Sequence, residues 1–316
     1  MPAMPTLLRS LPRLRGLLAR LCAGLLLALC VPVMADPVLP PGSHELGLRH
    51  AGRERGYTVR VPASYRADRP VPLVLALHGG GGSMEVMARD RLYGLVSQSE
   101  ASGWIVVFPN GFSRLAGKLA TWNAGLCCGA ARDTGSDDVG FLRAVVADVQ
   151  RRLAIDPQRI FATGMSNGGM MGYRLACEAS DVFRAIAAVA GTDGTTECRP
   201  GRPVPVFHIH AKDDDRVLFN GGSGSASDTH ADFVSVPATV DKWATLNACR
   251  GPVQRVLDKP GVVCEVRGGC AGGAEVRLCV TDSGGHAWPG GRKALGGKGS
   301  DALDATAEIW AFFARQ

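Results

Sequence analysis

The chain has 316 residues, of which 46% are hydrophobic and 20% are charged, and its formal net charge is +6. Residues 1–35 contain four arginines and no acidic residue, so residues 36–316 carry a net charge of only +2. These residues show no clustered Lys/Arg face and no alternation of aromatic and basic residues, which excludes a nucleic-acid-binding surface. They suffice for one domain that buries about three-quarters of its unfolded surface, and no linker or repeat interrupts them.

Residues 1–35 have the pattern of a secretory signal peptide. The arginines precede an apolar stretch over residues 21–33, and residues 33–35 (VMA) offer a cleavage site. The stretch is shorter than the about 20 residues that cross a bilayer. A lipid anchor at Cys30 is the alternative, although the large Leu29 stands before it. We expect a secreted chain, extracellular or periplasmic, that begins near Asp36 and has no stable membrane insertion.

The first elements are two expected strands, near residues 57–61 and 72–77. The second is continuously apolar, which is typical of a strand buried on both faces, and it ends in His78 and the glycines 79–82. A glycine run after a strand lets backbone N–H groups approach a developing oxyanion. We expect Gly80 to supply one such donor and His78 to be a structural hydrogen-bonding residue of this loop.

The next expected elements are a helix near 84–101, a strand near 104–108 and a helix near 138–153. They lead to an apolar strand at 159–163, the sequence Gly-Met-Ser-Asn-Gly at 164–168, and a helical segment at 167–179. Strand, sharp turn and helix form the context of a nucleophile elbow, in which the serine hydroxyl stands clear of the sheet. Ser166 is therefore the candidate nucleophile, and the N–H of Asn167 the second oxyanion donor.

The acid and the base are expected to follow in the order Ser, Asp/Glu, His. A strand at 204–210 leads to three adjacent aspartates, and one at 275–280 leads to a glycine-rich loop with His286. Apart from His230, in a Gly/Ser/Asp-rich loop, His286 is the only histidine after the aspartates. His286 is therefore the candidate base. Spacing does not choose among Asp213, Asp214 and Asp215.

The expected elements alternate between strand and helix. A strand near 185–190 and helices near 238–247 and 302–314 complete them. This alternation predicts an α/β fold with a mainly parallel sheet covered by helices on both faces.

Two other functions use some of the same residues. His208 and His210 alternate along one strand and share a face, so with Asp213 to Asp215 they are candidates for the metal site of a metallohydrolase. No second His/Asp cluster at ligand spacing completes that site. A non-catalytic binding protein would need a broken catalytic set, whereas every role has a candidate here.

Eight of the ten cysteines lie after residue 36. In an exported chain they indicate disulfides, and adjacent cysteines without any Cys-x-x-Cys pair argue against zinc. We predict two separate groups. One contains Cys249, Cys264, Cys270 and Cys279, and the other contains Cys127, Cys128, Cys177 and Cys198.

Several motifs occur together and in order: HGGGG at 78–82, WN at 122–123 with CCG at 127–129, DDVGF at 137–141, GMSNGGMM at 164–171, LACE at 175–178 and GHAWPG at 285–290. The chain resembles the secreted polyhydroxybutyrate depolymerase and feruloyl esterase group of α/β-hydrolases. The resemblance implies an α/β-hydrolase fold and hydrolysis of carboxylic esters through an acyl-enzyme, without cofactor or metal. It implies a small ester or oligoester substrate, either hydroxyalkanoate oligomers or feruloyl-type esters.

The resemblance also implies that the acid is Asp214, in a stretch that matches the family's His-Gly-Thr-x-Asp pattern. Ala211, Asp215 and Leu218 depart from that pattern, so Asp213 and Asp215 remain alternatives. Trp122 and Trp288 are expected either to wall the substrate pocket or to pack in the core.

Overall fold

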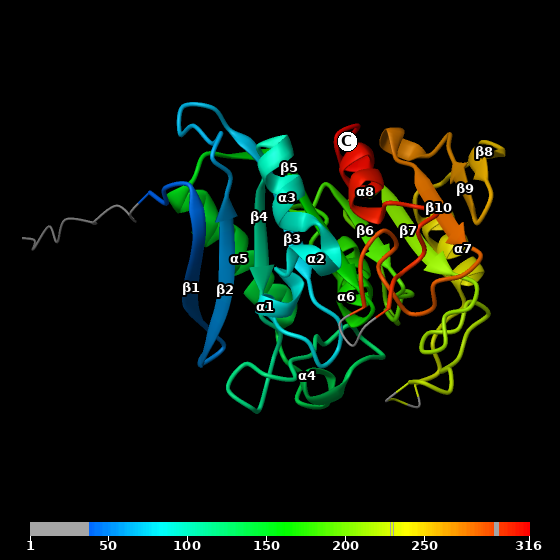
Figure 1. Ribbon diagram of the computed structural model, residues 1–316, viewed down its shortest axis with the longest axis horizontal. Helices are drawn as coiled ribbons and strands as arrows, with labels where there is room; N and C mark the ends of the chain where they lie inside the picture. Colours follow the sequence, from blue (N-terminus) through cyan, green and yellow to red (C-terminus); the bar gives the residue numbers. More distant parts are fainter. Residues whose placement is uncertain (1–37, 228, 230, 294–296) are drawn as a thin grey trace, which may run out of the picture. The chain divides into compact units, whose positions relative to one another are not determined.

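A computed structural model describes residues 38–227, 229, 231–293 and 297–316. The predicted signal peptide and His230 lie outside these residues. Within them, ten strands form one sheet in the order β1-β2-β4-β3-β5-β6-β7-β10-β9-β8 (Figure 1). The strands are β1 Gly42–His50, β2 Arg53–Val61, β3 Val71–Leu77, β4 Ile105–Pro109, β5 Ile155–Met165, β6 Ala185–Val189, β7 Val206–Ala211, β8 Val253–Lys259, β9 Val262–Arg267 and β10 Val276–Thr281.

The central strands β4, β3, β5, β6, β7 and β10 run parallel, and antiparallel strands flank them at both edges. Parallel strands end at the same edge of a sheet, where open α/β folds place their sites. The loops that follow β3, β5, β7 and β10 therefore meet at one edge.

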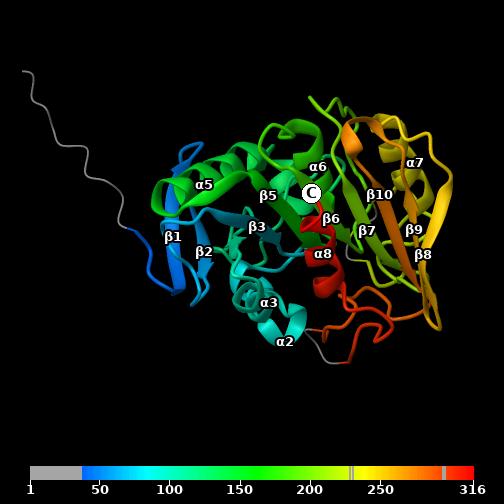
Figure 2. The ribbon, with the colours of Figure 1, turned by 90° about the horizontal axis from the view of Figure 1, so that it is seen from above.

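Helices cover both faces of the sheet, as Figure 2 shows. On one face α5, α6 and α7 pack against alternate apolar residues such as Leu73 and Leu75, and on the other α1, α3 and α8 pack against Val74 and Ala76. The helices are α1 Met84–Met87, α2 Asp90–Tyr93, α3 Leu95–Ser102, α4 Gly129–Asp133, α5 Asp138–Arg152, α6 Asn167–Glu178, α7 Val236–Leu246 and α8 Ala305–Phe313, with a short 3-10 turn η1 at Ala271–Gly273. The predicted α/β-hydrolase fold is confirmed. None of the described helices is long and apolar enough to cross a membrane.

The sequence prediction was wrong about one helix and missed several elements. The helix expected at 84–101 is three short helices, because Arg89 is extended and Gly94 is left-handed with φ 68°. The helix α4 and the strands β1, β8 and β9 were not predicted. The strand β1 alternates between half-buried and exposed residues, and β8 is mostly exposed, so neither has the apolar run that marks the central strands.

Candidate active site

Ser166 occupies the turn between β5 and α6 in a conformation that non-glycine residues rarely adopt, with φ 55° and ψ −122°. The backbone N–H of Ser166 donates to the Val189 carbonyl at 2.8 Å. Tight packing of backbone fixes this turn. A Cβ at Gly168 would lie 2.2 Å from the Leu77 oxygen, and one at Gly191 would lie 2.1 Å from the Ser166 oxygen. Surrounding backbone therefore maintains the unusual conformation.

The glycine loop after β3 lies directly beside this turn. A Cβ at Gly79 would lie 3.4 Å from the Ser166 Cβ, and one at Gly80 would lie 3.7 Å from the Asn167 Cβ. Asn167 is the first residue of α6, where backbone N–H groups have no partner within the helix. In the described part of the chain, neither the Gly80 nor the Asn167 N–H forms a hydrogen bond to the protein. Both donors are thus available close to the Ser166 side chain.

His78 is a buried structural residue of the glycine loop. Its Nδ1 donates to the Gly79 carbonyl at 2.8 Å, and its Nε2 accepts from the Gly111 N–H at 2.9 Å. These partners require the neutral ring, and burial lowers the pKa of His78 to about 4. The ring therefore fixes the loop and has no free nitrogen to act as a base.

Trp122 packs in the core behind the glycine loop, a position that favours the core role over the pocket wall. Its ring is fully buried, and its Nε1 donates to the His78 carbonyl at 2.9 Å. The side chain of Asn167 accepts from the Trp122 N–H at 2.7 Å and donates to the Trp122 carbonyl at 3.0 Å. Trp122 therefore packs behind the segments that carry both oxyanion-donor candidates.

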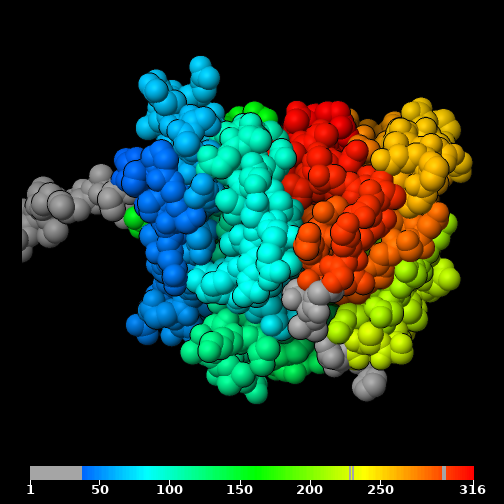
Figure 3. All heavy atoms as spheres, in the orientation of Figure 1, coloured from blue at the N-terminus to red at the C-terminus, as the bar shows by residue number. Residues whose placement is uncertain are grey.

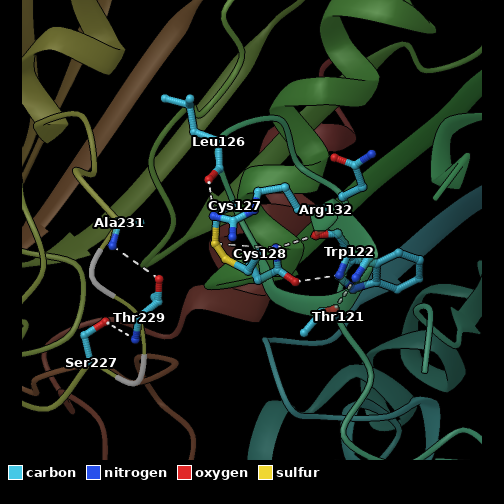
Figure 4. Close-up of a disulfide and its surroundings, with 12 residues drawn as sticks. Thr121, Trp122, Leu126, Cys127, Cys128, Arg132, Ser227, Thr229 and Ala231 are labelled. Atoms are coloured by element: carbon cyan, nitrogen blue, oxygen red, sulfur yellow. Dashed lines mark hydrogen bonds between the residues drawn. A yellow bond between two sulfur atoms is a disulfide. The ribbon is translucent and has the colours of Figure 1, made fainter. Parts of the chain in front are cut away.

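The segment after Trp122 contains a disulfide between adjacent cysteines, Cys127 and Cys128 (Figure 4). The Cys128 N–H donates to the Trp122 carbonyl at 3.0 Å, and the Arg132 guanidinium donates to the Leu126 carbonyl at 3.2 Å. The other disulfides described are Cys177–Cys198, Cys249–Cys270 and Cys264–Cys279. No described disulfide links the two predicted cysteine groups.

Asp214 is the aspartate that contacts His286. The His286 Nδ1 lies 2.8 Å from Asp214 Oδ2 and 3.0 Å from Oδ1. The Asp214 Oδ1 also accepts the backbone N–H groups of Arg216 and Val217, both at 2.9 Å. Asp213 instead accepts from the Gly284 and Gly285 N–H groups, at 3.3 and 2.8 Å.

Asp214 is a buried carboxylate whose charge is stabilised by its neighbours. Burial alone would raise its pKa, but hydrogen bonds from His210 and His286 lower the pKa well below the ordinary value. Asp214 is therefore ionised across the pH range in which histidines titrate, and it orients the Nδ1–H of His286.

A chain of buried side chains continues behind Asp214. His210 Nε2 lies 2.8 Å from the Val217 carbonyl and 3.3 Å from Asp214 Oδ2, and its Nδ1 lies 3.1 Å from His208 Nε2. His208 Nδ1 lies 2.7 Å from the Tyr173 hydroxyl. With neutral rings, every atom is satisfied when each group donates toward Asp214. Tyr173 donates to His208, His208 to His210, and His210 to Val217 and Asp214.

This series of hydrogen bonds argues against the metal site that was expected at His208 and His210. The two rings stack at 5.2 Å and point their nitrogens at each other, so they do not converge on a common ion. Among the described residues, no three His, Cys, Asp or Glu side chains are placed to hold a metal. The shared strand face of the two histidines was predicted, but Tyr173 was missed because it comes from α6.

A pocket of about 340 Å³ adjoins His286 and the end of β5. Its apolar wall includes Tyr93, Met165 and Trp288. The Trp288 ring contacts Tyr93 edge to face with ring centroids 5.4 Å apart, and its Nε1 donates to Thr306 at 2.9 Å. The loop after β10 (orange) lies against the segment that contains α2 and α3 (cyan) in Figure 3. Trp288 thus borders the pocket while its ring is largely buried.

Ser166 follows β5 and His286 follows β10, so both lie at the edge of the sheet where this pocket is found. Met165, which precedes Ser166, and His286 line the same pocket, but no hydrogen bond joins Ser166 to His286 among the described residues. Catalytic hydrogen bonds are often long before substrate binds and shorten in the complex.

The chain is similar to one protein-family model over part of its length and to several esterases. Residues 129–197 match the prolyl oligopeptidase family. The putative esterase NocK of Nocardia uniformis subsp. tsuyamanensis is 33% identical over 276 residues, 82% of this chain and 78% of NocK. Probable feruloyl esterase C of Aspergillus niger is 32% identical over 216 residues, 66% of this chain and 70% of that enzyme. Feruloyl esterase B of Piromyces equi is 31% identical over 240 residues, 74% of this chain but only 42% of that protein.

Solved structures support the fold alone, because their sequences are distant. An acetyl xylan esterase from Aspergillus awamori superposes with a TM-score of 0.59 at 14% identity, covering 86% of this chain and all of that chain. The native structure of sOPH superposes with a TM-score of 0.57 at 16% identity, covering 87% of each chain.

Proposed function

Because the chain belongs to the α/β-hydrolase family that contains the fungal feruloyl esterases, we propose that it is a secreted serine esterase. Its nucleophile is Ser166, its base His286 and its acid Asp214. The observation that carries this proposal is the meeting of three strand ends at one edge. Ser166 follows β5 on a strained turn, and His286 follows β10 while hydrogen-bonded to the buried Asp214, which follows β7.

The proposed reaction begins when the His286 Nε2 takes the proton from the Ser166 Oγ as it attacks the ester carbonyl carbon. The N–H groups of Gly80 and Asn167 stabilise the oxyanion of the tetrahedral intermediate. The C–O bond to the alcohol then breaks, and His286 returns the proton to the leaving alcohol. Water, deprotonated by His286, attacks the acyl carbon. The bond between that carbon and the Ser166 Oγ then breaks, His286 returns the proton to Oγ, and the acid is released. Asp214 orients His286 and stabilises its imidazolium throughout.

The proposed substrates are small carboxylic esters, either hydroxyalkanoate oligomers or feruloyl-type esters. The pocket beside His286 has apolar walls with a few polar anchors, as small-molecule sites generally have. Export is supported by the four disulfides, which persist in oxidising compartments.

A panel of p-nitrophenyl esters, methyl ferulate and hydroxybutyrate oligomers tests this function on the wild type and on Ser166→Ala. We expect a burst of p-nitrophenol from the wild type and a fall in kcat of about 10⁶-fold in Ser166→Ala. Ser64→Ala, at an exposed serine, is the control and keeps full activity. Equal rates in Ser166→Ala and the wild type would refute the proposal. Activity that a chelator removes and a divalent metal restores would favour a metallohydrolase instead.

A further inference from the structure

The pocket beside His286 has an excess of positive charge. Three cationic residues, Arg216, Arg292 and Lys293, line it together with a single carboxylate, Asp215. The pocket therefore combines an apolar wall with a group of three cations, Arg216, Arg292 and Lys293, which we call its cationic rim.

Two of these cations have no counter-ion among the residues that the structure describes. Within the described residues neither Arg292 nor Lys293 forms an ion pair, whereas Lys298 on the same turn pairs with Asp301 at 3.5 Å. A Cβ at Gly285 would lie 3.2 Å from the Lys293 Nζ. Because Gly285 immediately precedes His286, the Lys293 ammonium lies next to the proposed base.

The backbone restrains both residues. The Lys293 N–H donates to the Gly297 carbonyl at 3.0 Å, and Arg292 pairs with Lys298 in an antiparallel bridge. The Lys293 side chain is half-buried, so an anion beside it would be partly shielded from water and salt. Two cations with a restrained backbone and no ion pair among the described residues, both lining a partly apolar pocket, are suited to bind a carboxylate.

We infer that this pocket binds a carboxylate, and that the substrate is an ester that carries a free acid group. This inference rests on the proposed function and chooses between its two substrate classes. A linear hydroxyalkanoate oligomer ends in a carboxylate, whereas the carboxyl group of a feruloyl ester is itself esterified and neutral. The rim therefore favours oligoesters with a free acid end.

A matched pair of substrates tests the inference. 4-Nitrophenyl hydrogen glutarate carries a carboxylate, and 4-nitrophenyl methyl glutarate is its neutral counterpart. We expect the wild type to prefer the anionic ester in kcat/KM. Lys293→Met should lower the ratio of anionic to neutral kcat/KM by about fivefold, the contribution of one partly exposed ion pair. Adding Arg292→Gln should lower the ratio further.

Lys298→Met is the matched control, because Lys298 lies on the same turn, is already paired and does not line the pocket. It should keep the wild-type ratio. Added salt should reduce the preference of the wild type through screening and leave the double variant nearly unchanged. Glutarate itself should inhibit the wild type competitively, with an inhibition constant at least about fivefold higher in the double variant.

An unchanged ratio in the double variant would overturn the carboxylate site while leaving the esterase proposal intact. An equal fall in Lys298→Met would also overturn it, because the effect would then come from the general charge of the turn. If Ser166→Ala released nitrophenol from both esters as fast as the wild type, the esterase proposal itself would fail.

Discussion

The turn that carries Ser166 and the loop that carries His286 lie at the same edge of the sheet but are fixed by different means. Around Ser166, backbone approaches backbone so closely that Gly168 and Gly191 have no room for a side chain. Around His286, the imidazole is held by the buried Asp214, and the residue also borders a pocket with a cationic rim. We expect the rigid turn to fix the nucleophile, and the His286 loop to supply the base and to border the substrate.

The largest effect, a loss of kcat on the His286 side of the comparison, is expected from Asp214→Asn. The amide cannot hold the Nδ1–H of His286 as a carboxylate does, so kcat should fall about 10⁴-fold, as it does for this change in a serine protease. Asp258→Asn, at an exposed aspartate of β8, should change kcat little. Ester kinetics of both variants provide the measurement. A fall in Asp213→Asn as large as that in Asp214→Asn would mean that the wrong aspartate has been chosen.

A smaller effect, on stability, is expected on the rigid side from Gly168→Ala. The new Cβ would lie 2.2 Å from the Leu77 carbonyl, so the glycine loop would have to move, at a cost of about 3 kcal/mol or more. Gly172→Ala in the same helix meets nothing within 4 Å and should gain up to about 1 kcal/mol in helix propensity. Chemical denaturation measures both. Similar free energies of unfolding for the two variants would contradict the close packing described for this turn.

The smallest effect concerns pH and the buried His78. Its pKa is about 4 in the folded chain and about 6.5 when unfolded, so the unfolded chain binds the extra proton between these values. The stabilisation is complete above pH 6.5 and is lost as pH falls toward 4, by about 2 kcal/mol between pH 7 and pH 5. His78→Asn should remove that part of the slope.

Denaturation of the wild type and of His78→Asn at pH 7 and pH 5 measures this slope. His208, whose pKa burial also lowers, contributes in the same direction and remains in both chains, so it cancels in the comparison. Parallel pH profiles would show that His78 is not held neutral.

The buried central strands and the Ser166 turn could be predicted from the sequence far better than the partly exposed edge strands. Buried parallel strands have continuous apolar sequences, and a nucleophile turn has glycines on both sides of a serine. The strands β3 and β5 and the nucleophile candidate Ser166 could therefore be recognised. Edge strands such as β1 and β8 are partly exposed and carry mixed residues, which leaves no comparable signal.

The sequence pattern could not predict which side chains from distant elements contact each other. The choice of Asp214 over Asp213 depends on which carboxylate turns inward after β7, and spacing alone did not decide it. The link from Tyr173 on α6 to His208 on β7 joins residues 35 positions apart. The cationic rim is formed by loops after β7 and β10, which only the folded sheet brings together.

The proposed esterase mechanism depends most on Ser166 being an activated nucleophile. A fluorophosphonate probe measures this activation directly. Attack by the Ser166 Oγ would form an O–P bond and release fluoride, leaving a stable adduct that peptide mass spectrometry locates. We expect one adduct, on Ser166, that is absent from Ser166→Ala and forms far more slowly in His286→Ala. An unlabelled Ser166, or labelling that proceeds equally fast without His286, would contradict the account.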